Sequence, residues 1–128
     1  AAINEVEKRE NSVIDKYEGS SSLYEKLSKI NATILQDANS KQSAHLANLI
    51  QKELAKSTDE KLNRGVKQAG FQVLWGVAMP NVLVEVGFIT NSDERKNLTS
   101  KKYQTKIAKS IVNAIMRYKD DYEQYILE

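Results

Sequence analysis

The chain has 128 residues and a formal net charge of +2, which is enough for one domain with a hydrophobic core but too close to neutral to indicate a nucleic-acid partner. Because the sequence contains no cysteine, disulfides, thiolate metal sites and a cysteine nucleophile are excluded. The single histidine, His45, gives no basis for a catalytic triad or a multi-histidine metal site within this chain.

The first 56 residues are polar and predicted to be helical, with an interruption at "EGSSS", residues 18–22. Ser22 and Glu25 have the spacing of a capping box, which predicts the start of a second helix. A third helix is predicted over "SKQSAHLANLIQKELAK", residues 40–56. Its apolar stripe follows helical spacing and consists of Ser43, Ala47, Ile50 and Leu54, flanked by Leu46 and Leu49.

The middle of the chain is rich in β-forming residues. Two strands are predicted, Phe71–Trp75 and Val82–Val86, and the second is apolar on both faces, as in a central strand covered by helices. The apolar stretch over residues 71–89 is interrupted by Pro80 and several polar residues, so no transmembrane segment is predicted. Asn91, followed by Glu94 three positions later, indicates a capping box and the start of a short helix.

A long amphipathic helix is predicted for the C-terminal segment, with Ser100 as its N-cap. One face of this helix carries Tyr103, Ile107, Ile111, Ala114, Ile115 and Tyr118. The order helix, strand, strand, long helix predicts an α/β fold. Two strands make a poor sheet by themselves, so further strands are expected beyond this chain.

Glu85 stands out because it is an acid inside the most strand-like run, "VLVEVGF". It could be a strand-end acid that reaches solvent or pairs with Arg64 or Lys67. Its apolar neighbours instead favour burial, where an unpaired charge is costly. It also lies at the C-terminal end of the predicted strand, where open α/β sheets place their ligand crevices. A carboxylate in that position suits general acid/base catalysis or metal-site chemistry.

The segment from Arg64 to Tyr118 carries a family resemblance through "VKQAGFQVL", "MPNVLVEVGFITN" and "KIAKSIVNAI". The similarity continues upstream through "KRENSVI" and "SAHLANLIQKEL", so it covers essentially the whole chain. These motifs resemble the C-terminal part of the catalytic domain of the zinc-dependent N-acetylmuramoyl-L-alanine amidases, the type 3 family of bacterial cell-wall amidases. The resemblance implies an α/β fold: a three-layer arrangement with a twisted sheet covered by helices on both faces.

The resemblance also implies a reaction. The family cuts peptidoglycan at the amide between N-acetylmuramic acid and the L-alanine of the stem peptide, and its catalytic acid/base glutamate corresponds to Glu85. Zinc in the complete enzyme would be held by two histidines and a glutamate from motifs that precede Ala1. His45, in "SAHLANL", matches no ligand motif and is expected to be a surface or half-buried residue. No zinc is therefore expected in this chain, which should be inactive alone.

The polar first third corresponds in position to the helical insertion of the cell-division amidases, which covers the active site until an activator protein withdraws it. The resemblance thus implies one domain portion over residues 1–128, with a regulatory insertion at about residues 10–40. A carboxylate of the insertion can reach the metal in such enzymes. The candidates are Glu10, which we single out, and Glu5, Glu7, Glu18 and Glu25.

The chain begins "AAINEVEKRE", without an initiator methionine or a signal peptide, so a processed chain or a fragment is expected. The resemblance implies a periplasmic or cell-envelope location. A sheet edge left open by missing strands predicts self-association. Two alternatives remain open: a degenerate relative used for binding, and a non-catalytic helical interaction or regulatory module in which Glu85 is structural.

Overall fold

The computed structural model describes the backbone of residues 2–18, 23–75 and 77–127, and the side chains of residues 3–14, 39–75 and 77–127. The chain divides into two compact units. The first contains Ala1–Ser43 and Lys67–Val82, and the second contains Ala44–Val66 and Leu83–Glu128. The candidate catalytic residue Glu85 belongs to the second unit.

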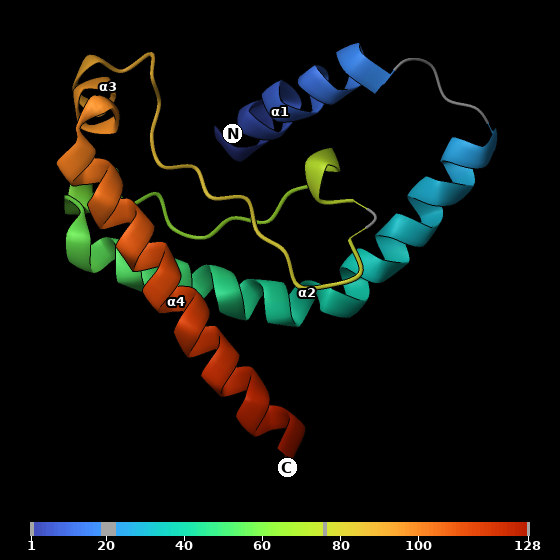
Figure 1. The fold of residues 1–128 in the computed structure, drawn as a ribbon. Helices are drawn as coiled ribbons and strands as arrows, with labels where there is room; N and C mark the ends of the chain where they lie inside the picture. Colours follow the sequence, from blue (N-terminus) through green and yellow to red (C-terminus); the bar gives the residue numbers. More distant parts are fainter. Residues whose placement is uncertain (1, 19–22, 76, 128) are drawn as a thin grey trace. The chain divides into compact units, whose positions relative to one another are not determined.

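Helices dominate the described residues (Figure 1). They are α1 (Ala2–Glu18), α2 (Leu23–Ser57), α3 (Ser92–Thr99) and α4 (Lys101–Leu127), with short 3-10 turns η1 (Glu60–Leu62) and η2 (Gln72–Leu74). Helix α1 ends at Glu18, where the interruption was predicted, while the predicted cap Ser22 and the side chain of Glu25 lie outside the described residues. The helix predicted at residues 40–56 is the end of α2, because no glycine or proline interrupts residues 23–57.

In the first unit, α1 contacts the segment that contains η2. Val6 and Phe71 are both buried there. The side-chain amide of Asn11 accepts a hydrogen bond from the backbone N–H of Gln72 and donates one to the carbonyl of Gly70, each at 2.9 Å. One asparagine thus satisfies two backbone groups on either side of Phe71.

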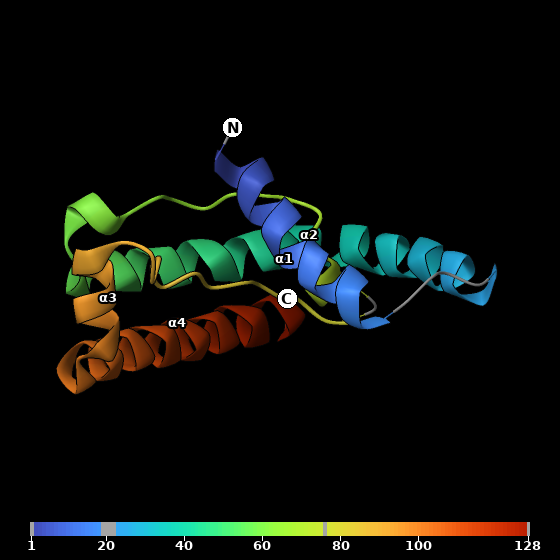
Figure 2. The ribbon, with the colours of Figure 1, turned by 90° about the horizontal axis from the view of Figure 1, so that it is seen from above.

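In the second unit, α4 runs antiparallel to the last part of α2, and the two helices lie side by side (Figure 2). The buried apolar residues of these two helix segments are Leu49 and Ile50 on α2 and Ile107 and Ala114 on α4. The predicted apolar face of α4 is therefore largely confirmed, except that Ile115 is 48% exposed. The predicted cap Ser100 directly precedes the helix, and its hydroxyl accepts from the N–H of Tyr103 at 3.5 Å.

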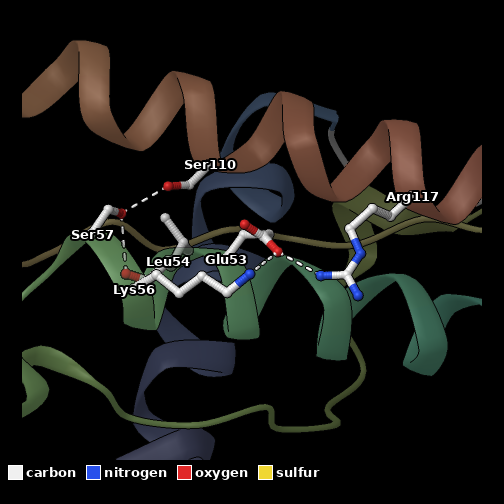
Figure 3. A network of polar contacts seen from close by, with 6 residues as sticks. All are labelled: Glu53, Leu54, Lys56, Ser57, Ser110 and Arg117. Carbon is white, nitrogen blue, oxygen red and sulfur yellow. Dashed lines mark hydrogen bonds and ion pairs between the residues drawn. The ribbon is translucent and has the colours of Figure 1, made fainter.

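A buried carboxylate joins the two helices (Figure 3). Glu53 Oε1 accepts from Lys56 Nζ at 2.5 Å and from Arg117 Nη1 at 2.7 Å, and one turn further along Ser57 Oγ lies 2.7 Å from Ser110 Oγ. The Glu53 residue is only 7% exposed. The hydrogen bond from Lys56, followed by that from Arg117, lowers the pKa of Glu53 below its ordinary value of 4.5.

The prediction of two β-strands is wrong. No β-strand occurs in residues 2–18, 23–75 or 77–127, so the expected α/β sheet with two strands is not observed. Within residues 71–75, Gln72–Leu74 form the turn η2, closed by hydrogen bonds from Leu74 N–H to Phe71 O and from Trp75 N–H to Gln72 O, each 3.0 Å. Residues 82–86 form no ladder, because a strand needs a neighbouring backbone and none of the described segments supplies one.

This correction removes the reason for expecting self-association, because an open sheet edge requires a sheet. None of the described helices combines the length and the apolar character that a membrane span requires.

The Glu53 contacts predict a pH-dependent contribution to stability. A carboxyl whose pKa is lowered by folding stabilises the folded state above its unfolded pKa, and this contribution is lost as the pH falls through the folded value. Glu53→Gln should therefore lower the urea midpoint at about pH 7, and its difference from the unsubstituted chain should shrink towards about pH 3. Circular dichroism would measure both midpoints. Glu60→Gln, at an exposed acid, is the control. A difference that is the same at both pH values would contradict this account of Glu53.

Candidate active site

Glu85 lies in the irregular segment between η2 and α3 and is exposed. Among the described residues it forms no hydrogen bond or ion pair. The predicted burial is therefore wrong, because the residues around it are themselves uncovered: Leu83 is 37% exposed and Val86 is 38% exposed. The alternative pairing with Arg64 is also wrong, since that guanidinium binds Glu94. The side chain of Glu85 is therefore exposed to solvent, and among the described residues only its backbone fixes its position.

A buried carboxylate, Glu94 in the first turn of α3, binds the backbone three residues after Glu85. Glu94 is 5% exposed. Its Oε1 accepts from Arg64 Nη2 at 2.6 Å, and its Oε2 accepts from the backbone N–H of Phe88 at 2.8 Å. The hydrogen bond from Arg64, followed by that from Phe88, lowers the pKa of the Glu94 carboxyl below 4.5. The carboxylate therefore stays charged at neutral pH and holds two segments together.

Gly87 and Arg64 complete this arrangement, which we call the Glu94 clamp (Arg64, Gly87, Phe88 and Glu94). Gly87 has φ +148°, a conformation that favours glycine, and a Cβ atom there would lie 3.1 Å from Glu94 Oε2. The Arg64 guanidinium lies over the Phe88 ring, with its Cζ 4.6 Å from the ring centroid, in cation–π geometry. Backbone, ring and carboxylate are thus fixed against one another three residues after Glu85.

Asn91 orients Glu94. Its side-chain oxygen accepts from the N–H groups of Asp93 at 3.0 Å and Glu94 at 3.2 Å, so it caps α3 as predicted. The capping-box interpretation is only half correct. In a capping box the Glu94 side chain would return to the Asn91 N–H, but that N–H donates to the Phe88 carbonyl at 3.1 Å. The carboxylate binds the Phe88 N–H instead.

His45 is not part of this site. Its Nε2 lies 2.8 Å from Asp121 Oδ2, its side chain is 45% exposed, and its ring centroid lies 5.8 Å from that of Tyr118. The prediction of a surface or half-buried histidine is confirmed. In the described part of the chain, no three histidine, cysteine, aspartate or glutamate side chains are grouped so that they could hold a metal ion. The described residues therefore do not fit a zinc site.

The carboxylates considered for autoinhibition are on the helical first third of the chain. Glu5 is exposed, and Glu7 and Glu10 are partly exposed, all on α1 in the first unit. The side chains of Glu18 and Glu25 lie outside the described residues. The assignment of Glu10 to the occlusion of an active site remains a prediction.

The Glu94 clamp predicts a cost for a side chain at position 87. Gly87→Ala places a methyl group against Glu94 Oε2 in a backbone conformation that alanine rarely adopts, so it should destabilise the fold by about 1–3 kcal/mol. Gly65→Ala is the matched control: Gly65 also has positive φ, at +71°, but nothing lies within 4 Å of the added Cβ. Urea denaturation followed by circular dichroism would compare the two variants. Equal or smaller destabilisation by Gly87→Ala would show that the close contact with Glu94 is absent.

The comparisons with known proteins cover most of the chain. The N-acetylmuramoyl-L-alanine amidase family matches residues 9–117. Three relatives come from Bacillus subtilis. Uncharacterized protein YqiI is 44% identical over 84 residues, covering 66% of this chain and 40% of that protein. The amidase LytC is 41% identical over 86 residues, covering 67% and 16%. A germination-specific N-acetylmuramoyl-L-alanine amidase is 36% identical over 73 residues, covering 57% and 31%.

No solved structure matches the chain. The chain spans two fifths or less of the length of the three relatives, although the family match covers most of its own residues. The resemblance carried by "MPNVLVEVGFITN" and its flanking motifs is confirmed, and the matched segment includes both Glu85 and the Glu94 clamp. The chain belongs to the N-acetylmuramoyl-L-alanine amidase family.

Proposed function

We propose that this chain is part of a peptidoglycan hydrolase that cleaves the amide between N-acetylmuramic acid and the L-alanine of the stem peptide, with Glu85 as general acid/base. The observation that supports this role most directly is an exposed carboxylate without a partner among the described residues, close in sequence to the Glu94 clamp and inside the family match. A catalytic acid/base must reach both water and substrate, and a carboxylate already used in an ion pair cannot do so as readily.

The proposed chemistry needs a group that can both take and return a proton. Amide hydrolysis requires a water to lose a proton as it attacks, and it requires the departing nitrogen to gain one, because an amide anion is a poor leaving group. A single carboxylate can do both in turn. Glu85 would accept the proton from the water and donate it to the nitrogen of L-alanine.

We extend the proposal to zinc in the complete enzyme, held by residues outside this chain. The described residues offer no ligand set, and the only histidine is bound to Asp121. A bound zinc ion supplies a Lewis acid for carbonyl chemistry. This chain alone should bind no zinc in a defined site and should be inactive. The family match supports a location in the periplasm or cell envelope, where peptidoglycan is found.

The helical first third is proposed to be regulatory. Residues 10–40 belong to the first compact unit, and they are helical wherever the backbone is described. This helical character supports a helical insertion. Its proposed role is to occlude the active site, with Glu10 as the candidate inhibitory carboxylate and an activator protein as the partner that withdraws it.

A second candidate function is a non-catalytic helical interaction or regulatory module. It is favoured by the helical character of the described residues, which contain neither a strand nor a group of metal ligands. In that case Glu85 would have no role in chemistry. The two candidates differ in what Glu85 does in a zinc-loaded complete protein.

Glu85→Gln tests the catalytic role. The substitution keeps the size and hydrogen-bonding reach of the side chain but removes its ability to accept a proton, so peptidoglycan hydrolysis by the complete protein should fall by about 10²–10⁴-fold. Zinc content and thermal stability should be unchanged, because the side chain is exposed and forms no ion pair with the described residues. Glu60→Gln is the control. Near-normal turnover would favour the non-catalytic module, and loss of zinc would make Glu85 a ligand.

Deletion of residues 10–40 tests the regulatory role. In the complete protein, the deletion should raise the basal rate of peptidoglycan hydrolysis measured without any activator. Zinc content and circular dichroism of the variant would establish that it is loaded and folded. If a loaded, folded deletion variant shows an unchanged or lower rate, these residues do not inhibit the enzyme.

A further inference from the structure

Glu85 depends on its backbone for its position, because its side chain has no hydrogen-bond or ion-pair partner among the described residues. The backbone around it is not held by a strand ladder in the described part of the chain. The first backbone group after Glu85 that is bound to a buried side chain is the N–H of Phe88, which donates to Glu94 Oε2 at 2.8 Å. Whatever holds that N–H therefore limits where the Glu85 carboxylate can lie.

The Glu94 side chain is not needed to start its own helix. Asn91 already caps α3 by accepting from the N–H groups of Asp93 and Glu94. The Glu94 carboxylate instead leaves the helix and binds two groups outside it, the Arg64 guanidinium and the Phe88 N–H. Burying a charge at 5% exposure is costly unless both oxygens are bound, and each oxygen here has one partner. The contact thus fixes the segment after Glu85 and adds little to α3 itself.

Gly87 allows the backbone to approach the Glu94 carboxylate closely. It is the residue between Val86 and Phe88, its φ of +148° is rarely adopted by other residues, and its missing side chain leaves room for Glu94 Oε2. The chain therefore turns at Gly87 directly before the bound N–H. Only Val86 separates this turn from Glu85, which is too short a stretch for the backbone to move independently of it.

We propose that Arg64 and Glu94 are positioning residues for Glu85. The Arg64 guanidinium orients the Glu94 carboxylate, which binds the Phe88 N–H. This bond fixes the backbone after Glu85 and so the position of the catalytic carboxylate. This inference rests on the proposed function, because it needs Glu85 to be the acid/base. It assigns no contact with substrate to either residue. Arg64 contributes both its ion pair at 2.6 Å and its packing over the Phe88 ring.

The test uses Glu94→Gln in the complete, zinc-loaded protein. A glutamine has one acceptor oxygen and a donor amide, so it can accept from the Phe88 N–H or from Arg64 but places a donor against the other. The Glu85 carboxylate should then be misplaced, and kcat on purified peptidoglycan should fall by about 10²-fold with little change in KM. Asp93→Asn is the matched control. It removes an acid of the same helical turn whose side chain is 87% exposed and whose ion pair with Lys96 is long, at 3.8 Å.

Two further measurements separate positioning from general stability. Amide hydrogen exchange at Phe88 should become faster in Glu94→Gln and stay unchanged in Asp93→Asn, with zinc content equal in all variants. The double variant Glu85→Gln with Glu94→Gln should be no slower than Glu85→Gln alone. Once residue 85 can no longer accept a proton, moving its side chain cannot lower the rate further. A multiplicative loss in the double variant would overturn the proposal, since Glu94 would then act independently of Glu85.

Arg64→Lys provides a second route if Glu94→Gln does not fold. Lysine keeps the charge but has no planar fork to bind Glu94 and stack on the Phe88 ring, so kcat should again fall at constant KM. A folded, zinc-loaded Arg64→Lys protein with normal kcat would overturn the proposal. If Glu85→Gln by itself leaves turnover intact, the proposed function fails instead, and the two failures are distinguished.

Discussion

The arrangement of the second unit around Glu85 depends on one buried carboxylate. Glu94 is almost completely removed from solvent, and such a charge is tolerated only when its oxygens are bound. Its two partners come from the segment after η1 and from the segment after Glu85. One side chain therefore connects three parts of the sequence at α3. Their relative positions follow from hydrogen-bond geometry more than from apolar packing.

Polar anchoring of this kind recurs because the apolar core is small. In the part of the chain that the structure describes, the buried apolar residues are Val6, Leu49, Ile50, Phe71, Ile107 and Ala114. Specific polar contacts fix the relative positions of segments that so few apolar contacts do not determine. Glu53 binds Arg117 between α2 and α4, and Asn11 binds the backbone on both sides of Phe71. The Asn11 contact satisfies two backbone groups, and the Arg117 contact adds a second cationic partner to the buried Glu53 carboxylate.

Local signals in the sequence predicted the helices, while contacts between distant residues could not be predicted from it. The cap at Asn91, the helix start at Ser100 and the break after Glu18 are each set within a few residues. The predicted strands failed because strand formation needs a partner backbone, which β-forming residues alone do not provide. Arg64 and Glu94 are 30 positions apart, and the capping-box spacing suggested a local partner for Glu94. Glu85 was identified as a candidate, but burial was favoured for it over the solvent-exposed alternative that the structure shows.

The family match shows that the chain belongs to the N-acetylmuramoyl-L-alanine amidase family, and the Glu94 clamp binds the backbone at the end of "VLVEVGF". The most direct measurement is the amide proton chemical shift of Phe88 by NMR as the pH is lowered. Protonation of Glu94 removes the charge that accepts this N–H, so the resonance should shift with a midpoint below 4.5, the direction in which Arg64 and Phe88 move the pKa of Glu94. A Phe88 resonance that does not respond to pH, or that titrates at or above 4.5, would contradict the account.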